Sequence, residues 1–207
     1  MNKIITISRE FGSGGREIGK RLADKLGYAY YDSEIINLLA KETGDSEDYI
    51  KNISEKGIYP IAFQFGKTFT VSYPLIKNQT DILVKQTKIL KQIADKGNAI
   101  IVGRGANVIL KEYNPMNIFV YANMDSKVNR CKKKALKDEN LTDKELINKI
   151  KDIDKNRKAF NSLISSLEWG NKKNYDLCIN TSNIEIKKII NPLSEYIEMW
   201  FGGSKND

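Results

Sequence analysis

The sequence predicts an α/β fold in which helices flank a parallel β-sheet. Apolar segments of strand length alternate along the chain with amphipathic segments of helix length. In addition, residues 99–102 form a continuous apolar run, which is typical of a strand covered on both faces. A length of 207 residues with 41% hydrophobic content suffices for one sizeable core. We therefore expect a single domain over residues 1–207.

The first half of the chain is expected to hold two strand–helix pairs followed by an insertion. Strands are expected at residues 3–8 and 28–31, and helices at 17–26, where Gly27 suits a left-handed cap, and at 34–43. Regular periodicity fails over about residues 44–78, so we expect an inserted subdomain there. Its aromatic residues either pack the insert or a homodimer contact, or stack on bases: Tyr59, Phe63, Phe65, Phe69 and Tyr73.

The second half continues the alternation of helices and strands. A helix at residues 79–96 ends at Gly97, and the strand at 99–102 leads into the segment GRGAN. Thr142 and Glu145 form a capping-box signature for the start of a further helix. The remaining expected elements are strands at 117–122 and 176–180, a basic helix at 125–136, and a closing helix at 186–200 in which Pro192 introduces a kink or a break.

The connection between the first strand and the first helix is rich in glycine. It reads SREFGSGGREIG, from Ser8 to Gly19. Glycines let the backbone approach an anion closely and turn several N–H groups toward it at the start of a helix. This loop therefore predicts a site for the phosphates of a nucleotide, built from Gly12, Ser13, Gly14, Gly15, Arg16 and Glu17.

The same loop departs from the phosphate-loop rule GxxxxGK[ST]. With Arg9 at the first glycine, Gly14 takes the second one and Gly15 stands where the lysine belongs. No hydroxyl follows, because Arg16 and Glu17 come next. Arg16 or Arg9 must then supply the missing cation, and the Glu17 carboxylate is a candidate ligand for magnesium, which prefers hard oxygen ligands.

Two further polar residues are expected at the same edge of the sheet. Asp32 follows the second strand and Arg104 follows the third, and ligands of such sheets bind outside the carboxyl ends of the strands. Arg104 could hold a phosphate in two parallel hydrogen bonds, or form a structural ion pair. Asp32 could contact a substrate or hold magnesium through water, or it could cap the helix that starts near Glu34.

The net charge of +8 is concentrated in one segment. Residues 127–158 contain 12 Lys and Arg against 6 Asp and Glu. The segment is either a lid that closes over phosphates, with Arg130 and Arg157 as its principal cations beside Lys133 and Lys134, or a solvated lysine-rich face. Asp154 and Arg157 could also pair on one helical face, which would contribute about 0.3–0.5 kcal/mol.

Composition excludes several classes of protein and chemistry. There is no histidine, the commonest general base, so a mechanism must use positioning, cations and carboxylates. Cys131 and Cys178 lack metal-site spacing and are expected to be reduced. No run approaches the roughly 18 apolar residues of a membrane span, and the start of the chain is strand-like. We expect a cytoplasmic protein without membrane contact. Nucleic acid is not an expected partner, because the basic segment lacks interleaved aromatic residues.

Five blocks of the sequence resemble the cytidylate kinase-like family, a bacterial and archaeal branch of the P-loop nucleoside monophosphate kinases. They are ITISREFGSGGREIGKRLADKLGYAYYD, IIVGRGAN, NIFVYA, DIDKNR and NYDLCINTS, in that order. The resemblance implies a P-loop NTPase fold with a five-stranded parallel sheet, a substrate-binding region at about residues 44–78 and a lid at about 127–158.

The resemblance also implies an activity and roles for the residues above. Cytidylate kinases transfer the γ-phosphate of ATP to CMP or dCMP with Mg²⁺, so the chain is expected to be an ATP-binding transferase. Arg130 and Arg157 match lid arginines, and Asp32 and Arg104 match substrate contacts. Arg16, in the matched phosphate loop, is the third expected catalytic residue because the lysine is missing. Because the lysine is missing, a nucleotide-binding sensor or regulator without catalysis is the alternative.

Overall fold

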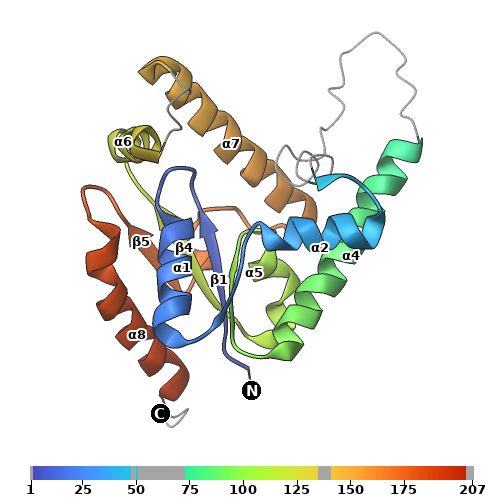
Figure 1. Ribbon diagram of the computed structural model, residues 1–207, viewed down its shortest axis with the longest axis horizontal. Helices are drawn as coiled ribbons and strands as arrows, with labels where there is room; N and C mark the ends of the chain where they lie inside the picture. The colour runs from blue at the N-terminus through green and yellow to red at the C-terminus, as the bar shows by residue number, and fades with distance from the viewer. Residues whose placement is uncertain (1, 48–49, 51–72, 135–140, 204–207) are drawn as a thin grey trace.

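Five parallel strands form one sheet in the order β2-β3-β1-β4-β5 (Figure 1). The computed structural model describes residues 2–47, 50, 73–134 and 141–203. The sheet confirms the predicted α/β fold, and the strand bounds differ from the predicted ones by at most one residue. The strands are β1 Ile4–Arg9, β2 Ala29–Tyr31, β3 Ala99–Val102, β4 Met116–Tyr121 and β5 Leu177–Asn180.

Helices cover both faces of the sheet. Alternate residues of a strand point to opposite faces, so Ile5 and Ile7 of β1 enter one apolar core while Ile4 enters the other. The first core is covered by α1 Gly15–Leu26 and α8 Ile190–Gly202. The second is covered by α2 Glu34–Thr43, α4 Tyr73–Lys96 and the short α5 Ala106–Ile109.

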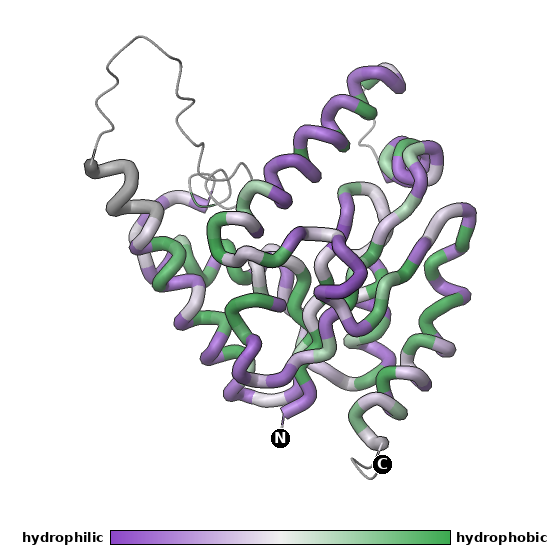
Figure 2. Tube along the Cα trace, turned by 180° about the vertical axis from the view of Figure 1, so that it is seen from behind, coloured by the Kyte–Doolittle hydropathy of each residue, from purple (hydrophilic) through white to green (hydrophobic). Residues whose placement is uncertain are grey.

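Of the described α-helices, two lie over the carboxyl ends of the strands (Figure 1). They are α6 Met124–Lys134 and α7 Asp143–Ile164. The predicted capping box is confirmed at the start of α7, where the Thr142 and Glu145 side chains each bond the other's backbone. Val128, Leu146 and Ile150 pack α6 against α7, and Phe11 from the loop after β1 packs on this cluster. Figure 2 shows the hydrophilic length of α7 above the hydrophobic strands.

Among the described helices, the starts of α4 and α8 differ most from their predicted positions, in both cases near a proline, whereas α1 begins at Gly15 rather than residue 17. Helix α4 begins at Tyr73 rather than residue 79, because Pro74 lies in the first turn, where a missing N–H is tolerated. The closing segment divides into a short 3-10 helix at Ile186–Ile189 and α8, so the predicted break precedes Pro192. Within the described ranges, no helix is long and apolar enough to cross a membrane.

The predicted insertion lies largely outside the described residues. Helix α2 ends with Gly44 as its left-handed cap. Residues 48–49 and 51–72 are not described, and with them the aromatic residues between Tyr59 and Phe69. The proposed substrate-binding region at about 44–78 therefore stays a prediction.

Candidate active site

The glycine-rich loop joins β1 to α1 directly and bends at two left-handed positions. Gly12 has φ +75° and Gly14 has φ +87°. No side chain caps the start of α1, whose N-cap residue is Gly14, so the helix presents uncapped N–H groups there. Such a terminus is suited to an anion, because the N–H groups and the helix dipole both favour negative charge.

Arg130 holds the loop from behind. Its Nη1 donates to the carbonyl oxygens of Gly12 (3.5 Å) and Ser13 (3.4 Å), and its Nη2 donates to the carbonyl oxygens of Thr181 and Ile184. The Thr181 hydroxyl also donates to the Ser13 carbonyl (2.6 Å). Burial lowers the pKa of Arg130 from its ordinary value. These bonds fix two loop carbonyls on the side of α6 and β5.

A cluster of charged side chains attaches α6 and α7 to the loop. The Lys127 ammonium, whose residue is 5% exposed, lies 2.8 Å from an Asp154 oxygen and 3.2 Å from a Glu10 oxygen. Asp154 also accepts the N–H of Phe11 (2.6 Å). Arg157 donates to the carbonyl oxygen of Arg9 (3.0 Å), and its Nη1 lies 3.4 Å from Asp154. The Asp154–Arg157 pair is thus part of a network with the loop rather than an isolated surface pair.

Asp32 lies between two arginines at the end of β2. The residue is 3% exposed. Its Oδ2 pairs with Arg16 Nε, and its Oδ1 lies 3.6 Å from Arg9 Nη2. Asp32 does not cap α2, because the N-cap residue is Ser33 and no side chain bonds that end of the helix. Among the described buried side-chain atoms, Asp32 Oδ1 is the one without a hydrogen-bond partner.

Tyr30 packs beside this acid. Its hydroxyl donates to the carbonyl oxygen of Arg16 (3.3 Å). Burial, followed by the charge of Asp32, raises the pKa of Tyr30 to about 12. Tyr30 therefore stays protonated at neutral pH and acts as a donor that fixes the first turn of α1.

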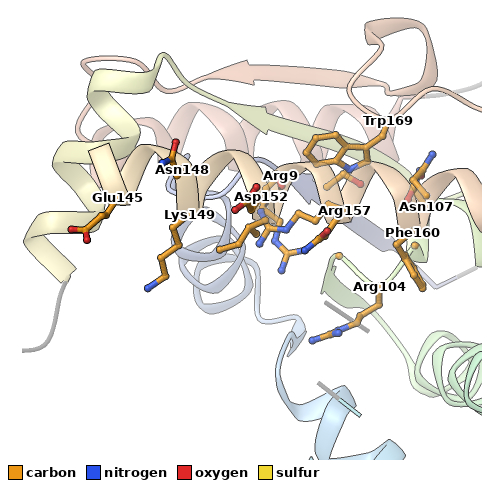
Figure 3. Close-up of a pocket in the computed structure, with 16 residues that line it drawn as sticks. Arg9, Arg104, Asn107, Glu145, Asn148, Lys149, Asp152, Arg157, Phe160 and Trp169 are labelled. Atoms are coloured by element: carbon orange, nitrogen blue, oxygen red, sulfur yellow. Dashed lines mark hydrogen bonds between the residues drawn. The ribbon is translucent and has the colours of Figure 1, made fainter. Parts of the chain in front are cut away.

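A pocket of about 530 Å³ opens between α7 and the carboxyl ends of β1 and β3 (Figure 3). Arg9 and Arg157 lie midway along it, Glu145 and Lys149 lie toward one end, and Phe160 and Trp169 lie toward the other. The amides of Asn107, Asn148 and Asn156 also line it. Its lining has four cationic side chains, Arg9, Arg104, Lys149 and Arg157, against the acids Glu145 and Asp152, so it suits an anionic ligand.

The loop after β3 has an unusual backbone. Gly103, Arg104 and Gly105 are three consecutive left-handed residues, with φ +77°, +61° and +64°. The Gln86 amide, which is buried, donates to the Arg104 carbonyl (2.9 Å). A left-handed arginine costs free energy and persists only when its surroundings impose it. This cost is consistent with a functional position for the Arg104 side chain at the pocket.

Glu17 is engaged with two cations. Lys134 lies 2.9 Å and Arg21 3.0 Å from its carboxylate oxygens. Burial alone would raise the pKa of Glu17, but the hydrogen bonds from Lys134 and Arg21 outweigh it, and the pKa lies below its ordinary value. No group of three or more potential metal-ligating side chains occurs in the described part of the chain.

The structure brings most of the predicted site residues to one edge of the sheet. Arg104 and Arg157 line the pocket, whereas Arg130 is behind the loop and Gly12–Glu17 do not line the pocket. Sequence reasoning missed Lys127, which pairs with Glu10, 117 positions away, and with Asp154, 27 positions away. It also missed Phe160 and Trp169. The one sequence feature that could have identified Lys127 is its position on the inward face of the predicted basic helix.

Comparison with known proteins agrees with this architecture. The model of the cytidylate kinase-like family matches residues 4–183. A cytidylate kinase of Saccharolobus islandicus (strain Y.G.57.14 / Yellowstone #1) is 24% identical over 197 residues, which cover 95% of this chain and 91% of that protein. The family match and the match to this relative each extend over most of the chain.

Solved structures share the fold. An uncharacterized protein from Eubacterium ventriosum ATCC 27560 aligns with a TM-score of 0.69 and 25% identity, over 95% of this chain and 98% of that one. Shikimate kinase from Bacteroides thetaiotaomicron aligns with a TM-score of 0.57 and 16% identity, over 96% and 99% of the two chains. With a family match over most of its length and this sheet order, the chain belongs to the cytidylate kinase-like family, whose fold is that of the P-loop kinases.

Proposed function

We propose that this protein is an ATP-dependent phosphotransferase that transfers the γ-phosphate of ATP to a nucleoside monophosphate, with CMP and dCMP as the first candidates. The observation that supports it most is the placement of a cationic pocket directly beside an uncapped, glycine-built helix start. A pocket of about 530 Å³ is also within the usual range for small ligands, about 300–1,000 Å³. Family membership and the related cytidylate kinase agree with this choice of acceptor.

In this proposal the two substrates meet at the end of β1. Residues 12–17 bind the phosphates of ATP, and Arg104 binds the phosphate of the acceptor. An acceptor phosphate oxygen forms a bond to the γ-phosphorus while the bond from that phosphorus to the bridging oxygen of ADP breaks. The attacking oxygen is already anionic, so no general base is needed, which suits a chain without histidine. Arg16, Arg130 and Arg157 contribute positive charge and positioning.

Asp32 is the residue that best fits the expected magnesium ion. Its Oδ1 is buried and lacks a hydrogen-bond partner, and carboxylate oxygen suits this cation, which keeps several waters in most protein sites. The ion, when bound, neutralises phosphate charge. Glu17 is the other candidate. Both carboxylates are paired with cations, Glu17 with Lys134 and Arg21 and Asp32 with Arg16, so the orphaned oxygen is what favours Asp32.

The test is an assay of ADP release with each nucleoside monophosphate and with small alcohols as acceptors. We expect turnover well above background with a pyrimidine nucleoside monophosphate. Absence of turnover with every acceptor would contradict the proposal. ATP binding by calorimetry together with that absence would instead support the sensor, the alternative that Gly15 in the lysine position favours.

Replacing Arg104 with alanine is expected to raise the KM for the acceptor about a hundredfold, because a bidentate contact to its phosphate is lost. The dissociation constant for ATP should change less than threefold. Arg104→Asn is the matched variant, since asparagine tolerates the left-handed backbone at this position. Equal losses in acceptor and ATP binding in both variants would mean that Arg104 supports the fold or the donor site.

A further inference from the structure

Gly15 is a glycine for reasons of space and not of conformation. The φ angle of Gly15 is not positive, so its backbone conformation is open to other residues. A Cβ at this position would lie 2.6 Å from the Cβ of Arg9 and 3.1 Å from its Cγ. The Cβ of Arg9 is fixed by the backbone of β1 and cannot move away as a side-chain end could. A side chain at residue 15 and a side chain at residue 9 therefore exclude each other.

A second glycine accommodates the other end of the same side chain. A Cβ at Gly103 would lie 1.8 Å from Nη1 of Arg9. Gly103 also has φ +77°, so its conformation favours glycine as well. The aliphatic part of the Arg9 side chain thus lies against Gly15 at the start of α1, and its guanidinium lies against Gly103 in the loop after β3.

The Arg9 side chain lies at the pocket where the proposed function places the acceptor phosphate. The Arg9 side chain is 15% exposed and lines the pocket together with Arg104 and Arg157. Asp32 pairs with Arg16, and its other carboxylate oxygen lies 3.6 Å from Nη2 of Arg9. Of these two arginines, Arg16 has the more exposed side chain, at 66%.

The phosphate-loop rule relates the two positions. In GxxxxGK[ST], the position of Arg9 is a glycine and the position of Gly15 is a lysine. This chain has the reverse arrangement, and the steric exclusion between the two Cβ atoms requires one position to be glycine. We propose that Arg9 supplies the cation that the loop lysine supplies in GxxxxGK[ST] proteins, with its charge directed at the transferring phosphoryl group. This inference rests on the proposed function.

The test exchanges the two residues. Arg9→Gly is expected to lower kcat about a hundredfold or more, because a single cation on the transferring phosphoryl group is worth several orders of magnitude. Gly15→Lys should lower both the melting temperature and kcat, because the new Cβ meets that of Arg9. The double variant R9G/G15K should exceed each single variant in kcat at least tenfold. The R9A/G15K variant is the matched control and should not recover, because alanine keeps the obstructing Cβ.

Two outcomes would overturn the inference. One is an R9G enzyme with wild-type kcat. The other is Arg16→Ala losing more of kcat than Arg9→Ala does. Lys91→Ala, which removes an exposed cation paired with Glu112, should leave kcat unchanged.

The steric part has a readout that needs no turnover. Gly15→Ala should lower the melting temperature in the wild-type background by several degrees and clearly less in the Arg9→Gly background. The wild type could show no turnover while Gly15→Ala still destabilises the Arg9→Gly background less. That result would contradict the proposed function and the catalytic role of Arg9. The steric exclusion between side chains at residues 9 and 15 would still hold. If Gly15→Ala lowers the melting temperature equally in both backgrounds, side chains at residues 9 and 15 do not exclude each other, and the inference is overturned.

Discussion

Replacing Lys127 with alanine is expected to lower the free energy of unfolding by about 3–5 kcal/mol, because removing one partner of a buried ion pair leaves uncompensated charge. The Lys127 ammonium lies between Glu10 and Asp154, and its side chain is 6% exposed. Without it, Glu10 loses this cation, and Asp154 keeps Arg157 at 3.4 Å but loses the closer contact of 2.8 Å. Denaturant unfolding followed by circular dichroism measures the change.

Lys132→Ala is the matched control for this variant. Lys132 is on the same helix and pairs with Asp143, but both side chains are largely exposed. Exposed pairs contribute at most about 1 kcal/mol, so the control should change stability very little. Equal effects of the two alanine substitutions would show that the cluster around Lys127 does not hold α6 and α7 on the loop.

Replacing Arg130 with alanine is expected to weaken ATP binding about a hundredfold. The guanidinium fixes the Gly12 and Ser13 carbonyls on the side away from the pocket, and a hydrogen bond to a charged group contributes about 1.5–3 kcal/mol. Without these bonds, the loop can turn its carbonyl oxygens toward the phosphates of ATP. The partial negative charge of these oxygens then repels the phosphates. Calorimetric titration with ATP measures the effect directly.

Arg130→Lys should give an intermediate loss, because an ammonium group cannot serve the same spread of acceptors as a planar guanidinium. Lys132→Ala should bind ATP like the wild type. ATP affinity within twofold of the wild type in Arg130→Ala would contradict this role. If kcat fell in that case, Arg130 would act on the transition state, as the family resemblance implies.

Local patterns predicted the sheet and most helix ends. The apolar run at residues 99–102 and the capping pair Thr142 and Glu145 both identified their elements correctly, because each depends on residues adjacent in sequence. The start of α4 was missed because Pro74 and the aromatic residues before it are typical of loops, whereas proline is compatible with a first helical turn.

The site was predictable only where topology determines it. Asp32 and Arg104 follow strands that are hydrogen-bonded neighbours in the sheet, so their convergence follows from the parallel order. The hydrogen bonds from Arg130 to loop carbonyls and the burial of Lys127 depend on packing between segments that are distant in sequence. Hydrophobic periodicity does not reveal such packing. The exclusion between Arg9 and Gly15 also required the backbone positions.

The hydrogen bonds that hold the phosphate loop determine when this loop can form during synthesis on the ribosome. Ser13 is translated well before Thr181, yet its carbonyl accepts a hydrogen bond from the hydroxyl of Thr181, 168 residues later. An emerging chain that ends before Thr181 has the glycines of the loop and Arg130, but it lacks the Thr181 hydroxyl that bonds Ser13 and the Thr181 carbonyl that holds Arg130 in place. Nucleotide affinity should therefore be low until the chain has been synthesised past Thr181, so that ATP stabilises only chains that already contain this residue.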